Sequence, residues 1–149
     1  MFNDSVKLRG DVAFVLKDKN GNVKEVRKIE NLIVSSGLEF MCSRMAGTSA
    51  GVMSHMALGS GTTAAAAGQT DLVSILGSRE ALDSSTASNN TITYVSSFEA
   101  GEGTGAVTEA GIFNAASSGT MLCRTVFPVI NKEADDTMSV TWTITITAS

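Results

Sequence analysis

The chain has 149 residues, of which 43% are hydrophobic and 17% charged, with one proline and a formal net charge of −4. A folded chain of this length buries roughly 68–70% of its unfolded surface, so one domain over residues 1–149 is expected. No apolar run reaches the roughly 18 residues of a membrane helix, and the acidic balance argues against nucleic-acid binding. We therefore expect neither membranes nor nucleic acids as partners.

Residues 6–34 are predicted to form a hairpin that carries the positive excess of the chain. The strands DVAFVLKD and VKEVRKIENLIV flank the turn DKNGN, whose Asn-Gly pair favours a tight reversal. Residues 1–30 hold seven Lys and Arg against five Asp and Glu, whereas the remainder holds four against ten. We predict that this basic hairpin docks on an acidic partner surface. The contact residues expected there are Phe2, Lys7, Arg9, Lys17 and Lys19.

One short helix is predicted over about residues 36–46. Ser35 or Ser36 can cap its start and Gly47 can close its end. Apolar residues recur at helical spacing in between, and they should form a stripe that packs on the core. These residues are Leu38, Met41 or Cys42, and Met45.

The segment SHMALGSGTTAAAAGQTDL, residues 54–72, most resembles a working site. It lacks the lysine that a phosphate-binding loop needs, and Gly59 and Gly61 lack the third glycine of a dinucleotide fingerprint. The glycines of GEGTGAVTEAG, residues 101–111, also have the wrong spacing for that fingerprint. We expect residues 54–72 to be a strand and an ordered loop that packs on the body of the protein or on a neighbour.

The segment Gly47-Thr48-Ser49-Ala50-Gly51 matches the GxSxG pattern of a nucleophile elbow. That elbow needs a strand before the serine and a helix after it, and here the predicted order is reversed. The histidine of the chain, His55, stands only six residues after Ser49, and no other histidine follows as a base. We predict no catalytic residues, and we expect His55 to be a neutral imidazole bonded to a backbone carbonyl.

Metal and cofactor sites are not predicted either. Cys42 and Cys123 lie 81 positions apart without a CxxC unit, and we expect two free, buried thiols. In the turn DKNGN, Val23 and Ile29 stand where a calcium loop needs glycine and glutamate. Glu133, Asp135 and Asp136 could together hold a hard cation in a loop, but we expect solvated acids before a strand. Glu99 and Glu102 could form a glycosidase acid pair, but nothing nearby in the sequence would raise the pKa of one of them.

The clearest strand is MSVTWTITIT, residues 138–147, in which apolar residues alternate with serine and threonine. Its buried face should consist of Val140, Trp142, Ile144 and Ile146. TITYVSSF (91–98) and TMLCRTVF (120–127) are also predicted strands, and Pro128 is expected to end the latter. With seven to nine short strands, we predict a mainly β domain, an antiparallel β-sandwich or jelly-roll-like fold with one short helix.

Five blocks of the sequence form a pattern when they are taken together. They are NLIVSSGL (31–38), MALGSGTT (56–63), TEAGIF (108–113), RTVFP (124–128) and NKEADDTMSVTWTITI (131–146). In this order they resemble a family of small structural proteins from the virions of tailed bacteriophages. The resemblance implies a non-enzymatic protein on the particle exterior, present in many copies and assembled in the bacterial cytoplasm. Its expected partners are the major capsid protein or tail and baseplate proteins, and we expect a homo-oligomer without a cofactor.

The resemblance leaves the location on the particle open. We favour capsid decoration over a tail, collar or baseplate adaptor or a fibre-attachment protein, because the chain has no heptad stalk and no collagen-like repeat. A carbohydrate- or receptor-binding module is the second alternative, although the sequence offers only Trp142 and Tyr94 as Trp or Tyr platforms. An enzyme is the third, with Ser49 as its nominal nucleophile.

Overall fold

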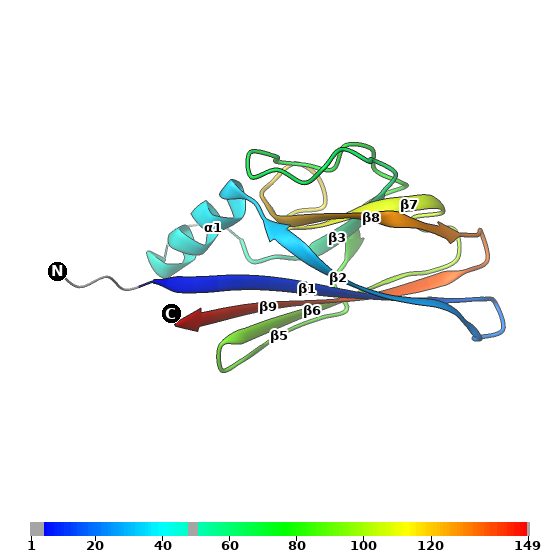
Figure 1. Ribbon diagram of the computed structural model, residues 1–149, viewed down its shortest axis with the longest axis horizontal. Helices are drawn as coiled ribbons and strands as arrows, with labels where there is room; N and C mark the ends of the chain where they lie inside the picture. The colour runs from blue at the N-terminus through cyan, green and yellow to red at the C-terminus, as the bar shows by residue number, and fades with distance from the viewer. Residues whose placement is uncertain (1–4, 48–50, 149) are drawn as a thin grey trace.

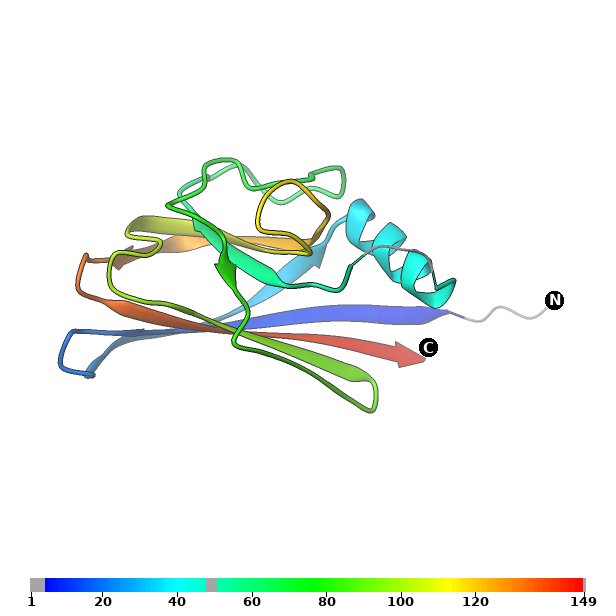
Figure 2. The same cartoon turned by 180° about the vertical axis from the view of Figure 1, so that it is seen from behind.

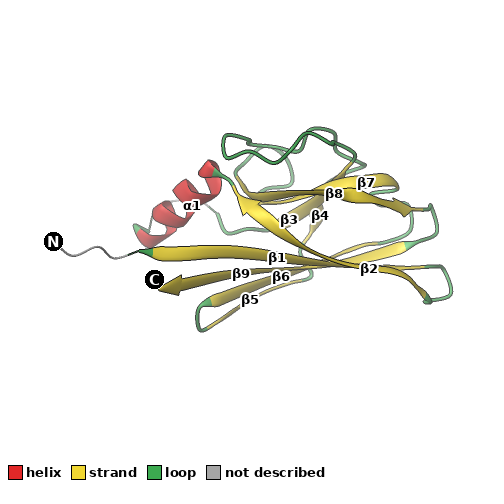
Figure 3. Ribbon diagram, viewed as in Figure 1, coloured by secondary structure: helices red, strands yellow, loops and turns green. Residues whose placement is uncertain are grey.

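The computed structural model describes residues 5–47 and 51–148, which form one helix and nine strands (Figures 1 and 3). The N-terminal half contains β1 (Val6–Lys17), β2 (Val23–Ile33), α1 (Ser35–Met45) and β3 (His55–Gly59). The remaining strands are β4 (Glu80–Ala81), β5 (Ser84–Ser88), β6 (Thr91–Phe98), β7 (Gly105–Phe113), β8 (Met121–Lys132) and β9 (Thr137–Ala148). The prediction of a mainly β fold with one short helix is confirmed.

The nine strands belong to one antiparallel sheet that curls into two layers. Its order is β4-β3-β7-β8-β2-β1-β9-β6-β5. β2 pairs with β1 along most of its length but with β8 only at Leu32 and Ile33, so it passes from one layer to the other (Figure 1). The inner faces of the two layers enclose the main hydrophobic core, as in a β-sandwich.

The pairing of β1 with β9 shows why the alternating patterns matter. All twelve residues of each strand are in register, from Val6 with Ala148 to Lys17 with Thr137. Val12 and Trp142 are partners in this register, and both point into the core. Val140, Trp142 and Ile144 are at most 1% exposed, which confirms three of the four predicted core residues of β9. The prediction is wrong for the fourth residue, Ile146, which is 37% exposed because it lies near the open end of the sandwich.

Pro128 does not end its strand, contrary to expectation. Val107 pairs with Ile130 and Glu109 with Val126, so residues 127–129 of β8 stand opposite Thr108 alone. This irregularity places Pro128 where the ladder needs no N–H, and an edge or a bulge is where proline is tolerated. The carbonyl of Pro128 instead accepts a hydrogen bond from the Arg27 guanidinium at 2.8 Å.

The helix α1 lies within a residue of its predicted bounds but has different contacts. Val34 is its N-cap and makes no side-chain cap bond, so neither serine caps it. Leu38 and Met45 are 43% and 89% exposed, so the predicted apolar stripe is wrong at these two positions. Met41, its third member, packs on the core as expected, together with Phe40. Gly37 determines which side of the helix faces the sheet, because it is buried against the backbone of β8.

Candidate functional site

Two charged residues are completely buried on the outer face of the β7 and β8 pair. Glu109 of β7 and Arg124 of β8 are both 0% exposed, and the Arg124 Nη2 lies 3.4 Å from the Glu109 Oε2. A buried ion pair is stable only when its remaining donors and acceptors are also satisfied. We call these two residues and the groups bonded to them the Glu109 centre.

The loop at residues 60–79, between β3 and β4, supplies most of those groups, and only the Arg124 Nε of this pair is left without a partner within the described residues. The Val73 N–H donates to Glu109 Oε1 at 2.7 Å. Arg124 Nη1 donates to the carbonyl of Thr63 and to Gln69 Oε1, each at 2.9 Å. The Thr108 hydroxyl donates to the carbonyl of Gly61 at 2.8 Å. The loop therefore covers the outer face of this layer, as Figure 2 shows from behind.

Gly59 at the end of β3 and Gly61 within the loop allow its close approach. A Cβ on Gly61 would lie 1.7 Å from Glu109 Oε2, and a Cβ on Gly59 would lie 2.6 Å from the carbonyl of Ser74. The segment that most resembled a working loop is thus a strand and a loop packed on the body of the protein. We expected this loop to pack either on the body of the protein or on a neighbouring molecule, and in the structure it packs on the body.

A second group of buried charges joins the β8–β9 turn to the β1–β2 hairpin. Lys132 is 2% exposed, and its Nζ donates to the carbonyls of Glu99 at 2.9 Å and Asp136 at 2.7 Å. The Asp136 carboxylate accepts from Lys24 Nζ at 2.7 Å and from the Glu133 N–H at 2.8 Å. The bond from Lys24 lowers the pKa of Asp136, whereas burial lowers the pKa of Lys132. We call this group the Lys132 centre.

One of the three acids expected to be solvated before β9 is buried in the Lys132 centre. Asp136 is only 3% exposed and is not a solvated acid. Glu133 and Asp135 are exposed, as expected. Among residues 5–47 and 51–148, no group of three or more His, Cys, Asp or Glu side chains is placed to hold a metal ion.

His55, Cys42 and Cys123 lie on three different elements, β3, α1 and β8. Ser49 and Phe2 fall outside the described residues. His55 begins β3 half-buried, and its Nδ1 lies 2.8 Å from the hydroxyl of Ser54, so the predicted backbone carbonyl is not its partner. Both cysteines are free, but Cys42 is exposed on α1 and only Cys123 is buried. Desolvation raises the pKa of the Cys123 thiol well above its usual value.

The predicted contact residues of the basic hairpin have different surroundings. Arg9 pairs with Asp11 at 2.9 Å and Glu30 at 3.1 Å, so its charge is compensated within the hairpin. Lys7, Lys17 and Lys19 are exposed, and none of them pairs with an acid in the described part of the chain. Arg9 therefore contributes less positive charge to the surface of the hairpin than the sequence suggests.

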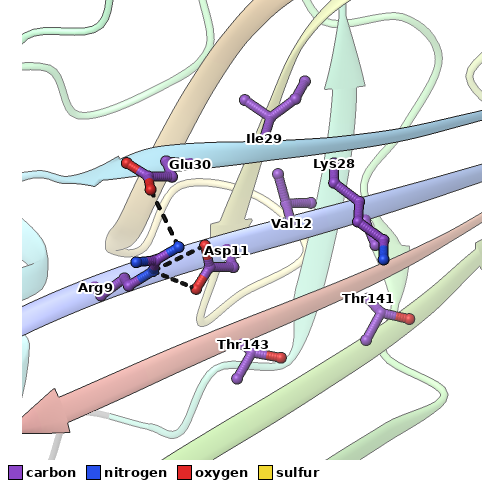
Figure 4. A pocket seen from close by; sticks show the side chains of 9 residues that line it. Arg9, Asp11, Val12, Lys28, Ile29, Glu30, Thr141 and Thr143 are labelled. Carbon is purple, nitrogen blue, oxygen red and sulfur yellow. Dashed lines mark hydrogen bonds and ion pairs between the residues drawn. The ribbon is translucent and has the colours of Figure 1, made fainter.

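Arg9 borders an uncovered sheet face. Figure 4 shows a hollow there in which Arg9, Asp11 and Glu30 form one ion-pair network beside Thr141 and Thr143. Outward-facing threonines and serines continue from β9 across β6 to β5. They are Ser139, Thr141, Thr143, Thr145, Thr91, Thr93, Ser97, Ser84, Thr86 and Ser88. Apart from Val95 these positions are polar, and charges lie only at the margins, on β1 and β2 at one side and at the other on Asp83, whose carboxylate accepts a hydrogen bond from the Ser97 hydroxyl at 2.6 Å.

An apolar groove lies on the opposite side of the same strands. It runs between α1 and the inner surface of β5, β6 and β9. Its walls include Phe40, Met41, Met45, Val52, Met53, Ala87, Ile92, Tyr94 and Ile146. Met45 and Val52 are 89% and 62% exposed, so the groove opens to solvent.

The sequence offered one signal for the buried charges. Arg124 and Glu109 each interrupt an apolar strand, in MLCRTVF and AVTEAGIF, which is unusual for a solvated charge. Which groups satisfy them could not be read from the sequence, because their partners lie in a loop tens of residues away.

Within the described residues, no helix is long and apolar enough to cross a membrane. No family model, no curated protein and no solved structure matches this chain.

Proposed function

We propose that this chain is a non-enzymatic structural protein of a tailed-phage virion, present in many copies on the particle exterior. The observation that carries the proposal is where the five blocks of the resemblance lie. Gly61 and Thr63, Thr108 and Glu109, and Arg124 come from three separate blocks, and they meet at the Glu109 centre. The resemblance thus falls on residues that build the body of the protein.

The other two blocks also fall on packing contacts. The last block supplies Lys132 and Asp136 to the Lys132 centre and Trp142 to the core. The first supplies Gly37, which seats α1 on β8. The blocks of the resemblance therefore consist largely of residues that pack inside the protein. This suits a protein that presents rigid outer surfaces to its neighbours, and it supports a structural role over an exposed active site.

We favour head decoration as the location, with the basic hairpin as the contact to an acidic shell surface. Of the predicted contact residues, Lys7, Lys17 and Lys19 are exposed and remain available for such a contact. Complementary charge would govern the encounter and the register, and buried apolar contacts such as Phe2 would supply affinity. Charge reversal at Lys7, Lys17 and Lys19 should therefore reduce incorporation into particles, and the wild-type protein should be released as salt rises.

Quantitative mass spectrometry of purified particles tests the proposal. A decoration protein should be found in numbers comparable to the major shell protein. A tail or baseplate protein should be found in small multiples of three or six and should remain with detached tails. Absence from the particles would overturn the structural role.

The glycan-binding alternative is weakened by one observation. The single tryptophan and the single tyrosine, Trp142 and Tyr94, are 0% and 6% exposed, so neither offers a stacking platform for a sugar ring. A glycan array with a clear hit would reopen this alternative. Labelling by a fluorophosphonate probe would reopen the enzyme alternative at Ser49.

A further inference from the structure

The two edges of the nine-stranded sheet differ in how they are protected. β4 forms one edge, is only two residues long and begins with the charged Glu80. β5 forms the other edge with the sequence SSTAS, and all five residues are exposed. Natural edge strands usually avoid pairing through short length, charge, proline or a bulge. β5 has none of these within residues 84–88.

The direction of the free backbone groups of β5 follows from the register. The carbonyl of Asn90 accepts a hydrogen bond from the Ile146 N–H, so even-numbered residues of β6 face β9 and odd-numbered ones face β5. Thr93 pairs with Thr86, which places Ser84, Thr86 and Ser88 toward β6. The N–H and C=O groups of Ser85 and Ala87 consequently point away from the sheet.

We propose that a second copy of this chain pairs with β5 through its own β5, antiparallel, about a two-fold axis at Thr86. In this register Ser85 of each copy stands opposite Ala87 of the other, and both residues have their backbone groups free. Each such pair can exchange two hydrogen bonds. The proposal concerns the purified chain and does not depend on the virion location.

The absence of charged residues in β5 favours a second copy of the chain over a charged partner strand. A symmetric interface brings each side chain near its own equivalent, so a charged strand would repel itself. Residues 84–88 are uncharged, so a basic or acidic partner strand would find no opposite charge along them. Asp83, which precedes β5 and continues its pairing with β6, would lie opposite Asn89 of the second copy and not opposite its own equivalent. Thr86 would meet Thr86 of the second copy, which extends the threonine row of Thr143 and Thr93 across the axis.

The apolar groove supplies the hydrophobic part of this interface. Ser85 and Ala87 form the β5 margin of the groove, so the groove and the edge are one continuous surface. Stable protein interfaces bury about 1,200–2,000 Å² in total, more than a five-residue strand pairing provides. The exposed side chains of Met45 and Val52, which line this groove, are available to be covered when the grooves of the two copies adjoin.

Disulfide trapping tests both the interface and its register. In a Cys42→Ser background, Thr86→Cys places two thiols at a non-hydrogen-bonded pair, where the Cα atoms are about 4.5 Å apart. Ser84→Cys is the matched control, because its equivalent lies several residues away along the partner strand. Under mild oxidation we expect a covalent dimer for Thr86→Cys and little for Ser84→Cys. Equal trapping of both variants, or none with Thr86→Cys, would overturn the proposal.

Charge substitution gives a test that needs no cross-link. Thr86 is exposed on the outer face, so Thr86→Arg and Thr86→Glu should leave the fold intact, as circular dichroism would show. Light scattering of the wild-type chain should give twice the monomer mass of 15.4 kDa, with dissociation on dilution. Each variant alone should raise the dissociation constant about fivefold, the size expected for one like-charged pair across two strands, and mixing the two should restore dimers. A wild-type chain that stays monomeric, or a dimer indifferent to both substitutions, would contradict it.

Discussion

Gly37 of α1 lies so close to Leu122 of β8 that a Cβ on the glycine would be 2.1 Å from the leucine carbonyl oxygen. Backbone contact of this kind leaves no room for relaxation, so Gly37→Ala should push the helix from the sheet and lower the free energy of unfolding by about 1–3 kcal/mol. Urea denaturation would measure the loss. Gly51→Ala is the matched control, since nothing lies within 4 Å of its Cβ position.

The Glu109 centre should be sensitive to the loss of either partner. Glu109→Ala leaves the guanidinium of Arg124 buried without its counter-charge and removes the acceptor of the Val73 N–H. Breaking a buried pair in this way costs about 3–5 kcal/mol. The loop at residues 60–79 should also become open to limited proteolysis before the protein unfolds. A Glu109→Ala variant with wild-type stability and an uncut loop would show that the pair does not hold the loop.

Trp142 tests the core of the sandwich. It is 0% exposed, and Trp142→Ala should cost about 3–5 kcal/mol through lost burial and the cavity that remains. Ile146→Ala, on the same strand and the same face, should cost less than about 1 kcal/mol because Ile146 is 37% exposed. As the single tryptophan, Trp142 should also emit at the short wavelengths typical of a buried indole. An emission maximum typical of solvent would contradict this placement.

Acid should weaken the contribution of the Lys132 centre to the stability of the fold. The pKa of Asp136 is lowered in the folded state, chiefly by the bond from Lys24, so its ionised form stabilises the fold above the unfolded pKa. That contribution is lost as the pH falls through the folded pKa, below about pH 4. Asp136→Asn should therefore be less stable than the wild type at pH 7, and the difference should shrink in acid. Asp135→Asn, at an exposed neighbour, is the control and should leave the stability at pH 7 close to that of the wild type.

Tyr94 should resist ionisation in alkali. Burial, with a smaller contribution from Cys123, raises the pKa of Tyr94 to about 12. Because the folded state holds this proton more tightly than the unfolded state, stability should fall as the pH rises above about 10. Phenolate absorbance should appear near pH 12 in the folded protein and near pH 10 in denaturant. A folded-state titration near 10 would place Tyr94 in solvent.

The strands were predictable from the sequence because their local pattern and their environment agree. TITYVSSF became β6 with the same limits, residues 91–98, since its alternation matches one buried and one open face. Pro128 was misread because its effect depends on the partner strand, where a bulge removes the need for its N–H. Ile146 continues a perfect alternation, but burial also depends on whether the opposite layer extends that far.

The site was less accessible to sequence reasoning than the fold. Residues such as Ser49 and His55 attracted attention through their chemistry, whereas Glu109 and Arg124 form the buried ion pair. A charged residue in an apolar strand signals a buried partner but does not name it. The partners of Arg124, at Thr63 and Gln69, belong to a loop whose path depends on the finished sheet.

The alignment of β1 with β9 also has a consequence for how the chain reaches its native state. It joins residues as far apart as Val6 and Ala148, and no register pair in it is closer in sequence than Lys17 and Thr137. Contacts of such high contact order are slow to form, because loop entropy must be overcome before they contribute any stability. On the ribosome, β1 must wait for the whole of β9 to emerge. Until then its β9-facing edge is exposed, and this interval is when chaperones would have most effect on the yield of folded protein.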